Sequence, residues 1–309
     1  MDNIAKNKRR IWVAIMFSLI MEGLGQIYCG RLKRGLVFTL LNLLPIPIII
    51  GIFYLGDSPA LMPITIAVII SSGLVQVIAL VDAVILAKKA PANYQLKSCN
   101  SAAIYILLVL ITTAGAIGSG LYLRDKSLEA FKVSAASMFP TIELNERVLA
   151  NKHIYAETDP QVGDIVIFNP PNEHWRINYI KRVVAVAGDT VERKNDVLFI
   201  NGKQLQRRHA SFTTLEIPEG EFKGSIYHEE NGQSRYQIFV ADRETEQQLS
   251  APDFALLTVP EHHVFVLGDN RNLSSDSRTF GPIPLAAVNG RADYIYFPVN
   301  DWSRFGKLK

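Results

Sequence analysis

Long apolar runs fill the first 123 residues of this 309-residue chain and are almost absent from the rest. A membrane-spanning helix needs about 20 mostly apolar residues, and residues 35–55, 62–86 and 102–123 supply three such stretches. A fourth stretch, residues 11–29, contains Glu22, Gln26 and several glycines, so it is more typical of a re-entrant or tightly packed segment. The pattern predicts a membrane domain at residues 1–123, with three or four hydrophobic helices.

Basic residues flank the apolar runs, as is typical of the cytoplasmic ends of membrane helices. They are Lys6, Lys8, Arg9 and Arg10, then Arg31, Lys33 and Arg34, then Lys88, Lys89 and Lys97. With the N-terminus and the 88–97 loop inside, three spans place everything after residue 123 outside the cytoplasm. The alternative is four spans with an exported N-terminus. Both arrangements predict a multi-pass protein of the cytoplasmic (inner) membrane with an extracytoplasmic, periplasmic C-terminal domain.

The second half, residues 124–309, is mixed in composition and long enough to bury a core of its own. The net charge of the chain is +3, which is too small to indicate a nucleic-acid partner. Both cysteines, Cys29 and Cys99, lie in the membrane half, and the adjacent His262 and His263 lack the spacing of zinc ligands. We therefore expect a domain that folds by packing alone, without a metal or cofactor.

Short β-branched runs separated by turns fill this second half. They cover residues 147–150, 164–168, 177–187, 197–200, 236–240, 263–267 and 292–297. Glycine-containing pairs such as Asn201-Gly202 and Gly268-Asp269 mark the connections. The pattern predicts an all-β, mainly antiparallel domain. Residues 203–258 are more polar, with a turn at 229–232 and a charged run at 243–248, and they predict a β-rich insertion.

A serine and a lysine stand out within these runs. Ser137 lies in Val133-Ser-Ala-Ala-Ser-Met-Phe-Pro-Thr141, where Pro140 constrains the turn, and Lys181 lies in Tyr179-Ile-Lys-Arg-Val-Val-Ala-Val-Ala-Gly-Asp189. A lysine buried among apolar neighbours loses hydration of its charged form, and once neutral it is a competent general base for a serine hydroxyl. Taken alone, each stretch has a plainer interpretation: a turn serine, and a lysine that reaches solvent from a half-exposed strand.

A dense polar run follows the strand at 263–267. It reads Gly268-Asp-Asn-Arg-Asn-Leu-Ser-Ser-Asp-Ser-Arg-Thr-Phe-Gly281. A surface loop is the plain interpretation. The functional one is that Asp269, Arg271, Asp276 and Arg278 pair their charges within the loop and stiffen it, while Ser274 or Ser277 hydrogen-bonds a neutral lysine.

Together the three stretches resemble the signature boxes of type I signal peptidases, the membrane-bound serine/lysine proteases that remove signal peptides from exported proteins. The resemblance covers the last apolar run and most of residues 124–300. It implies an all-β catalytic domain, preprotein signal peptides as substrates, membrane lipid and the secretion machinery as partners, and no cofactor. The implied cleavage follows a small residue in an Ala-x-Ala site.

The resemblance also implies roles for individual residues. Ser137 matches the nucleophile and Lys181 the general base, Ser274 the serine that orients the lysine, and Tyr179 a residue packed beside it. Asp276 and Arg278 match a bracing ion pair, Asp269 and Arg271 belong to the same box, and Met138 lines the pockets for small side chains.

The sequence departs from the family in two places. Where the family often has a serine that completes the oxyanion hole, this chain has Ala135, next to Ser134, so the Ser137 amide or the Ser134 hydroxyl is left as donor. The membrane half is also longer than the one or two spans usual in the family. Three alternatives remain open: a self-cleaving repressor-like protease, a catalytically silent membrane scaffold, and a protease for a few dedicated substrates.

Overall fold

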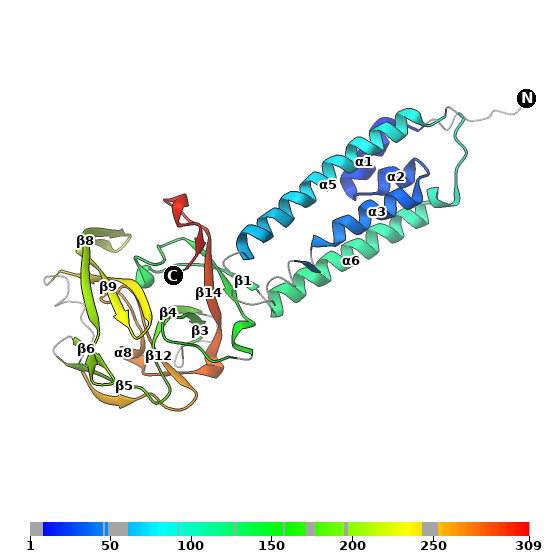
Figure 1. The fold of residues 1–309 in the computed structure, drawn as a ribbon. Coiled ribbons are helices and arrows are strands. Elements are labelled where there is room, and N and C mark those ends of the chain that lie inside the picture. The colour runs from blue at the N-terminus through cyan, green and yellow to red at the C-terminus, as the bar shows by residue number, and fades with distance from the viewer. Residues whose placement is uncertain are drawn as a thin grey trace, which may run out of the picture. The chain divides into compact units, whose positions relative to one another are not determined.

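The structure is a computed structural model that divides into two compact units, Met1–Ser127 and Leu128–Lys309 (Figure 1). It describes residues 9–45, 47–48, 61–91, 93–126, 128–156, 158–170, 177–194, 197–242 and 253–308. Three features of the sequence therefore lie wholly or partly outside the described residues: Lys6 and Lys8, much of the predicted span at 35–55, and the charged run at 243–248.

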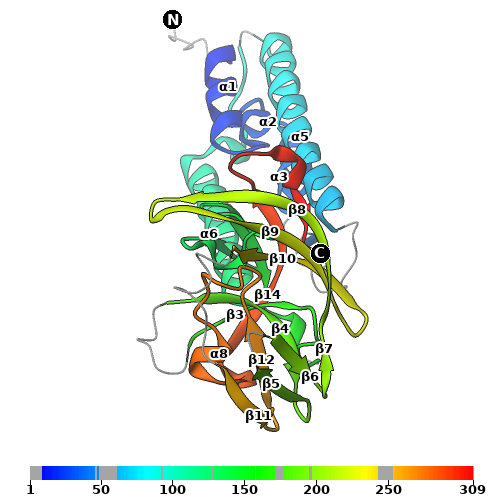
Figure 2. The same cartoon turned by 90° about the vertical axis from the view of Figure 1, so that its left-hand side faces the viewer.

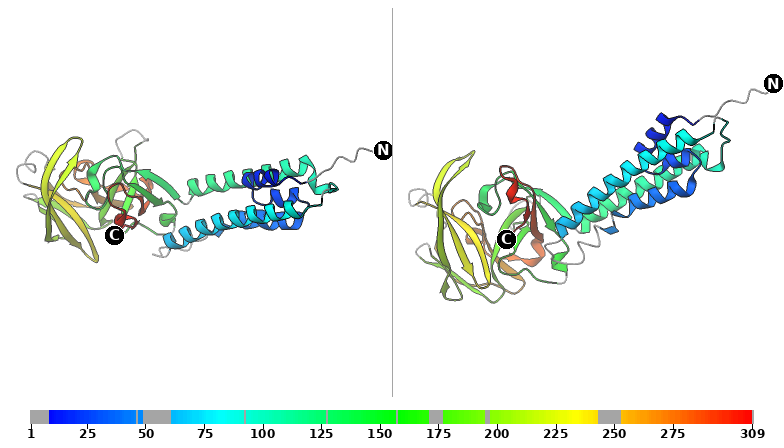
Figure 3. Two further views of the ribbon diagram at one scale, coloured as in Figure 1. Left: turned by 90° about the horizontal axis from the view of Figure 1, so that it is seen from above. Right: turned by 45° about the horizontal axis from the view of Figure 1, so that its top comes forward.

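The first unit is helical. Its described elements are α1 (Ile11–Ile20), α2 (Leu24–Tyr28), α3 (Leu32–Leu43), α5 (Leu61–Lys89), η1 (Ser98–Asn100) and α6 (Ala102–Lys126). Among the described residues, two stretches are long and apolar enough to cross a membrane, Pro63–Lys89 and Ala102–Tyr122. Figure 3 shows the short helices α1 to α3, in blue, lying alongside the long ones.

Glycines explain the break in the stretch at 11–29. Gly23 precedes α2 with a φ of +100°, a conformation that side chains rarely adopt. A β-carbon on Gly23 would come within 2.2 Å of the Gly35 carbonyl oxygen, so α2 and α3 touch backbone to backbone here. The buried Gln26 side chain donates a hydrogen bond of 2.7 Å to the Ala79 carbonyl of α5. The stretch therefore forms two short helices, α1 and α2, and these contacts pack α2 against α3 and α5.

The described residues of the second unit form three β-sheets. The largest has the order β1-β2-β14-β3-β4-β12-β13, with β15 on β14. Its strands are β1 (Leu128–Lys132), β2 (Arg147–Asn151), β3 (Ile165–Phe168), β4 (Tyr179–Val186), β12 (His263–Leu267), β13 (Ile283–Pro284), β14 (Val288–Phe297) and β15 (Gly306–Lys307). Every pairing of described strands is antiparallel, which confirms the predicted all-β, mainly antiparallel fold.

Two smaller sheets accompany the large one. One has the order β11-β5-β6-β7, from β5 (Thr190–Lys194), β6 (Val197–Ile200), β7 (Lys203–Gln204) and β11 (Phe254–Thr258). The other has the order β10-β9-β8, from β8 (Gln206–Ile217), β9 (Gly220–Asn231) and β10 (Ser234–Ala241), and Figure 2 shows its long hairpin in yellow-green. The range 203–258 therefore contains a separate sheet at 206–241, whereas β11 pairs back onto β5.

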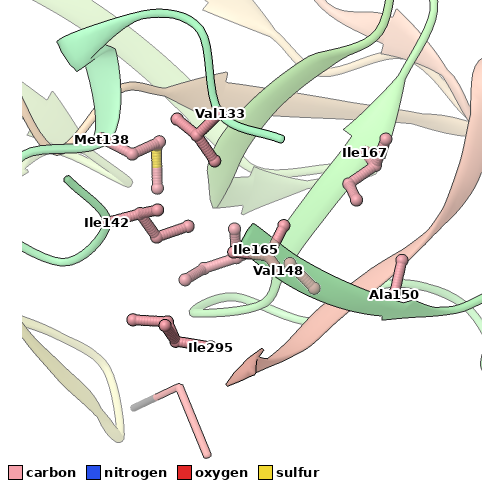
Figure 4. Close-up of a cluster of buried hydrophobic side chains, with 9 residues drawn as sticks. Val133, Met138, Ile142, Val148, Ala150, Ile165, Ile167 and Ile295 are labelled. Atoms are coloured by element: carbon pink, nitrogen blue, oxygen red, sulfur yellow. The ribbon is translucent and has the colours of Figure 1, made fainter. Parts of the chain in front are cut away.

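The core of the large sheet anchors the segment that carries Ser137. Met138 and Ile142 lie in a buried cluster with Val148 of β2 and Ile165 of β3, and Figure 4 shows these side chains converging. Met138 is 1% exposed. Full burial of an aliphatic side chain of this size contributes about 1.5–3 kcal/mol, so the turn after β1 is fixed to the sheet on both sides of Pro140.

Candidate active site

Ser137 lies in a single helical turn, η2 (Ala136–Met138), directly after β1 and Val133. Its neighbours Ala136 and Met138 are buried, while Ser137 itself is half-buried. Phe139 has extended backbone angles, φ −61° and ψ 137°, which is the conformation that a following proline favours. The sequence therefore places one hydroxyl at the surface of a turn whose other side chains are locked in the core.

Lys181 reaches this hydroxyl from the middle of β4. Its Nζ atom lies 2.8 Å from Ser137 Oγ and donates a second hydrogen bond of 3.0 Å to the Ile180 carbonyl. The Tyr179 ring, which was predicted to pack beside the lysine, has its centroid 5.2 Å from Nζ. Because β3 and β12 pair with β4 on either side, the lysine is fixed at the centre of the sheet and is only 4% exposed.

Burial sets the protonation of this lysine. Loss of hydration lowers the pKa of Lys181 from its ordinary value of 10.5 to about 8, although the negative charges of Asp276 and Asp269 oppose the change. A substantial fraction of the amine is therefore neutral near pH 8. A neutral amine 2.8 Å from a hydroxyl is placed to accept its proton.

The polar loop after β12 braces the site through Asp276. Ser274 donates a hydrogen bond of 2.8 Å to Asp276 Oδ2, the Gly268 N–H donates one of 2.9 Å, and Arg278 pairs with both carboxylate oxygens. Burial alone would raise the pKa of Asp276, but the charge of Arg278 and these hydrogen bonds outweigh it and hold the pKa below its usual value. The carboxylate therefore stays charged and ties the loop together.

Neither predicted serine bonds the lysine directly. Ser277 accepts a hydrogen bond from the Val266 N–H, and Ser274 is engaged with Asp276. Among the described residues, the hydrogen bonds of Lys181 Nζ go to Ser137 and Ile180. Ser274 still lies close by, because a β-carbon on Gly268 would come within 2.2 Å of Ser274 Oγ and 2.5 Å of the Ser137 carbonyl oxygen.

The expectation that Asp269 and Arg271 stiffen the loop by pairing within it was wrong about their partners. Asp269 forms a two-point ion pair with Arg182 of β4, at 2.8 and 2.7 Å. Arg271 forms a buried ion pair with Glu229 of β9. The two residues therefore bind different sheets instead of each other.

Four residues of the site region were missed by the sequence reasoning: Arg182, Glu229, Gly268 and Asn270. The charge of Arg182 beside Lys181 was the available signal, since a fully buried arginine requires a carboxylate partner. Glu229 was interpreted only as part of a turn. Nothing in the sequence distinguishes Asn270 from its polar neighbours, because its importance depends on contacts with residues 136 and 137.

A cleft of about 320 Å³ opens beside Ser137 and Lys181. Its lining includes Ser134, Ala135 and Met138 from the first stretch, Tyr179 and Ile180 from β4, and Leu273 from the polar loop. Ser134 and Ala135 are exposed. Among the described residues, no group of three or more His, Cys, Asp or Glu side chains could hold a metal ion.

Sequence comparisons match this chain to signal peptidases. The family model described as signal peptidase, peptidase S26, matches residues 103–297. A probable signal peptidase I-1 of Synechocystis sp. is 30% identical over 224 residues, covering 71% of this chain and 91% of that protein. The signal peptidase I of Pseudomonas aeruginosa is 36% identical over 171 residues, covering 51% of this chain and 57% of that protein.

A solved structure gives a further match. The crystal structure of a signal peptidase I from Enterococcus faecalis V583 is 31% identical to this chain, with a TM-score of 0.25. The match covers 43% of this chain and 97% of that one.

Proposed function

From the premise that this chain belongs to the signal peptidase family, peptidase S26, we propose that it removes signal peptides from preproteins with Ser137 as nucleophile and Lys181 as general base. The observation that carries the proposal is the 2.8 Å separation of Lys181 Nζ and Ser137 Oγ. It supports the division of roles because a hydroxyl becomes an effective nucleophile when an adjacent neutral base takes its proton.

The first half-reaction acylates the enzyme. Neutral Lys181 takes the proton of Ser137 as Oγ attacks the carbonyl carbon of the scissile peptide bond, and the carbonyl oxygen becomes negatively charged. In this proposal the Ser137 backbone N–H donates a hydrogen bond to that oxygen and stabilises it. The intermediate collapses when the lysine ammonium gives its proton to the leaving amine, which frees the mature protein and leaves an ester between Ser137 and the signal peptide.

Water completes the reaction. Lys181, neutral again, takes a proton from a water molecule as the water oxygen attacks the ester carbon. The second intermediate collapses with return of the proton to Ser137 Oγ, and the signal peptide leaves as a carboxylic acid, which then loses its proton to solvent. In this proposal the ion pair of Asp276 and Arg278 takes part in neither transfer; with the hydrogen bonds from Gly268 and Ser274 it holds the loop together.

We also propose that small side chains before the cleaved bond enter the cleft beside Ser137. The apolar side chains of Met138 and Ile180 are part of its lining. In this proposal the walls of the cleft favour an Ala-x-Ala site by excluding bulky residues. The apolar helices imply a membrane protein. We infer a multi-pass arrangement in the cytoplasmic membrane with the unit at 128–309 outside the cytoplasm, near membrane lipid and the secretion machinery.

The test is cleavage of a purified preprotein with an Ala-x-Ala site by the full chain in detergent. Ser137→Ala and Lys181→Met should each abolish cleavage. The matched controls are Ser211→Ala on the exposed part of β8 and Lys152→Met, whose lysine pairs with Glu129 away from the cleft. Retained cleavage by Ser137→Ala or Lys181→Met would refute the dyad. No cleavage by the wild type would favour a dedicated substrate or a silent scaffold.

The membrane arrangement needs a separate experiment. A single cysteine introduced at Ser211 should react with a membrane-impermeant thiol reagent added to intact spheroplasts, because that residue is exposed on the second unit. Labelling only after lysis would place the unit in the cytoplasm and overturn the inferred topology.

A further inference from the structure

Asn270 connects the sheet β10-β9-β8, called the inserted sheet below, to the turn that carries Ser137. It is fully buried, and the residues on either side of it are held by ion pairs to different elements, Asp269 to Arg182 and Arg271 to Glu229. Its position is therefore fixed before any contact of its own side chain is considered.

The last strand of the inserted sheet, β10, forms backbone hydrogen bonds with the residues on either side of Asn270. Phe239 of β10 donates a hydrogen bond of 2.9 Å to the Asp269 carbonyl and accepts one of 3.0 Å from the Arg271 N–H. This is an isolated parallel bridge between Phe239 and Asn270. The same phenylalanine is fully buried against Phe139, with ring centroids 5.5 Å apart, so β10 touches both the loop and the turn.

From this position Asn270 bonds both carbonyls that flank the Ser137 α-carbon. Its side-chain Nδ2 donates a hydrogen bond of 3.2 Å to the Ala136 carbonyl, and its backbone N–H donates one of 3.1 Å to the Ser137 carbonyl. Its Oδ1 accepts a hydrogen bond of 3.1 Å from the Leu273 N–H. The amide orientation is unambiguous because its nitrogen faces a carbonyl and its oxygen faces an N–H.

The Ala136 carbonyl matters because it shares a peptide unit with the Ser137 N–H. A trans peptide is planar, and its C=O and N–H point in opposite directions. A hydrogen bond that fixes the Ala136 oxygen therefore fixes the direction of the Ser137 N–H. The Phe139 N–H also donates to this oxygen, at 3.1 Å, and the Asn270 amide uses its second lone pair.

We propose that Asn270 is a positioning residue that aims the Ser137 backbone N–H at the oxyanion of the acylation step. The inference rests on the proposed function, in which Ser137 is the nucleophile. Stabilisation of the oxyanion depends more strongly on the Ser137 N–H in this chain, because the position two residues before Ser137 is an alanine, Ala135, which offers no side-chain hydroxyl as a second donor. The role of β10 follows: the backbone bridge from its Phe239 holds Asn270, and Asn270 holds the oxyanion donor.

The experiment compares Asn270→Ala with Asn272→Ala in the full chain. Asn272 is the matched control because it lies in the same loop and accepts a hydrogen bond from the Ala241 N–H, not from the turn. For Asn270→Ala we expect kcat to fall on the order of 10-fold to 100-fold, less than the roughly 10²–10³-fold cost of deleting an oxyanion donor. KM and the midpoint of the pH–rate profile should stay unchanged, and Asn272→Ala should cleave like the wild type.

A transition-state mimic separates positioning from a general structural effect. A peptide aldehyde accepts Ser137 Oγ at its carbonyl and forms a tetrahedral oxyanion, whereas an uncleavable peptide of the same sequence binds without one. Asn270→Ala should weaken binding of the aldehyde by the factor lost in kcat. The affinity for the uncleavable peptide should stay unchanged, because only the aldehyde complex depends on the oxyanion donor. Equal weakening of both ligands, or a kcat within threefold of the wild type, would overturn the proposal.

Two further variants guard against misfolding of Asn270→Ala and test the proposed function separately. If thermal melting shows that Asn270→Ala is unfolded, Asn270→Asp takes its place, because the carboxylate keeps the shape and the acceptor for Leu273 but loses the donor to Ala136. Ser137→Ala is measured in parallel. Cleavage by Ser137→Ala would refute the proposed function itself, whereas an inactive Ser137→Ala beside a fully active Asn270→Ala would refute only the positioning role.

Discussion

The Nζ atom of Lys181 lies 2.8 Å from the Oγ atom of Ser137, although 44 positions separate the two residues in sequence. The contact joins the centre of a buried strand to a turn fixed in the core, so neither group needs to move for a proton to pass between them. From this pairing we predict how cleavage depends on pH, how substitutions change the free energy of unfolding, and how neighbouring residues affect the rate.

The rate of cleavage should rise with pH. Only the neutral amine accepts the serine proton, and the pKa of Lys181 lies near 8, so kcat/KM of the wild type is expected to increase about tenfold per pH unit below that value and to level off above it. The measurement is kcat/KM from pH 6 to 10 on a substrate without titratable groups near the cleaved bond. A flat profile would show that Lys181 is not the base.

Lys181→Met should stabilise the protein at neutral pH while abolishing activity. Burial lowers the pKa of the lysine from 10.5 to about 8, which corresponds to a cost on the order of 3 kcal/mol when the group is charged. Methionine fills similar space without that cost. Denaturant unfolding at pH 7 should show a higher free energy of unfolding for Lys181→Met than for the wild type.

The sign of the pH dependence is fixed by linkage. Between pH 8 and 10.5 the unfolded chain holds a proton that the folded wild type has released, so wild-type stability rises with pH through this window. The advantage of Lys181→Met should therefore be largest below pH 8 and disappear as the pH approaches 10.5. An advantage that grows with pH would contradict the assignment.

Gly268→Ala should impair catalysis severely. The added carbon would lie 2.2 Å from Ser274 Oγ and 2.5 Å from the Ser137 carbonyl oxygen, so the loop or the turn must shift. A misplacement of about 1 Å at a reacting group costs roughly 100-fold in rate, and we expect a loss of at least that order in kcat. Thr279→Ala, at an exposed position of the same polar stretch that does not line the cleft, is the control in the same assay and should lose little.

Glu229→Gln should destabilise the second unit much more than Glu230→Gln. Glu229 is fully buried against Arg271 and Arg207, while Glu230 pairs with Arg235 at the surface. Loss of one partner of a buried pair costs about 3–5 kcal/mol, whereas an exposed pair contributes about 0–1 kcal/mol. Denaturant titration of the two variants gives the comparison, and equal midpoints would show that the buried pair does not stabilise the loop.

Ala135→Ser should increase the rate of acylation. A hydroxyl at this exposed cleft position would offer the oxyanion a second donor beside the Ser137 amide. We expect kcat to rise on the order of 10-fold, below the roughly 100-fold that a built-in donor supplies. Single-turnover kinetics measure the step directly. If kcat is unchanged, and Ser134→Ala is also unaffected, the backbone amide serves as the donor without help from either neighbouring side chain.

The sequence alone predicted the features that depend on local pattern. Apolar runs of about 20 residues indicate membrane helices because the bilayer sets their length, and the β-branched runs between turns indicate antiparallel strands. The order of the three stretches around Ser137, Lys181 and Ser274 was enough to indicate the family that the comparisons then confirmed.

Tertiary structure decided which charges and polar groups meet. Arg182 and Asp269 are 87 positions apart, and Glu229 and Arg271 are 42 apart, so no local spacing connects them. Asp269 and Arg271 lie two positions apart in the polar loop and bind β4 and β9, and only the packing of the two sheets determines which partner each one reaches. The sequence therefore determined the kinds of elements and the chemical groups available, while the positions of Asn270 and Gly268 against the Ser137 turn depended on the folded sheets.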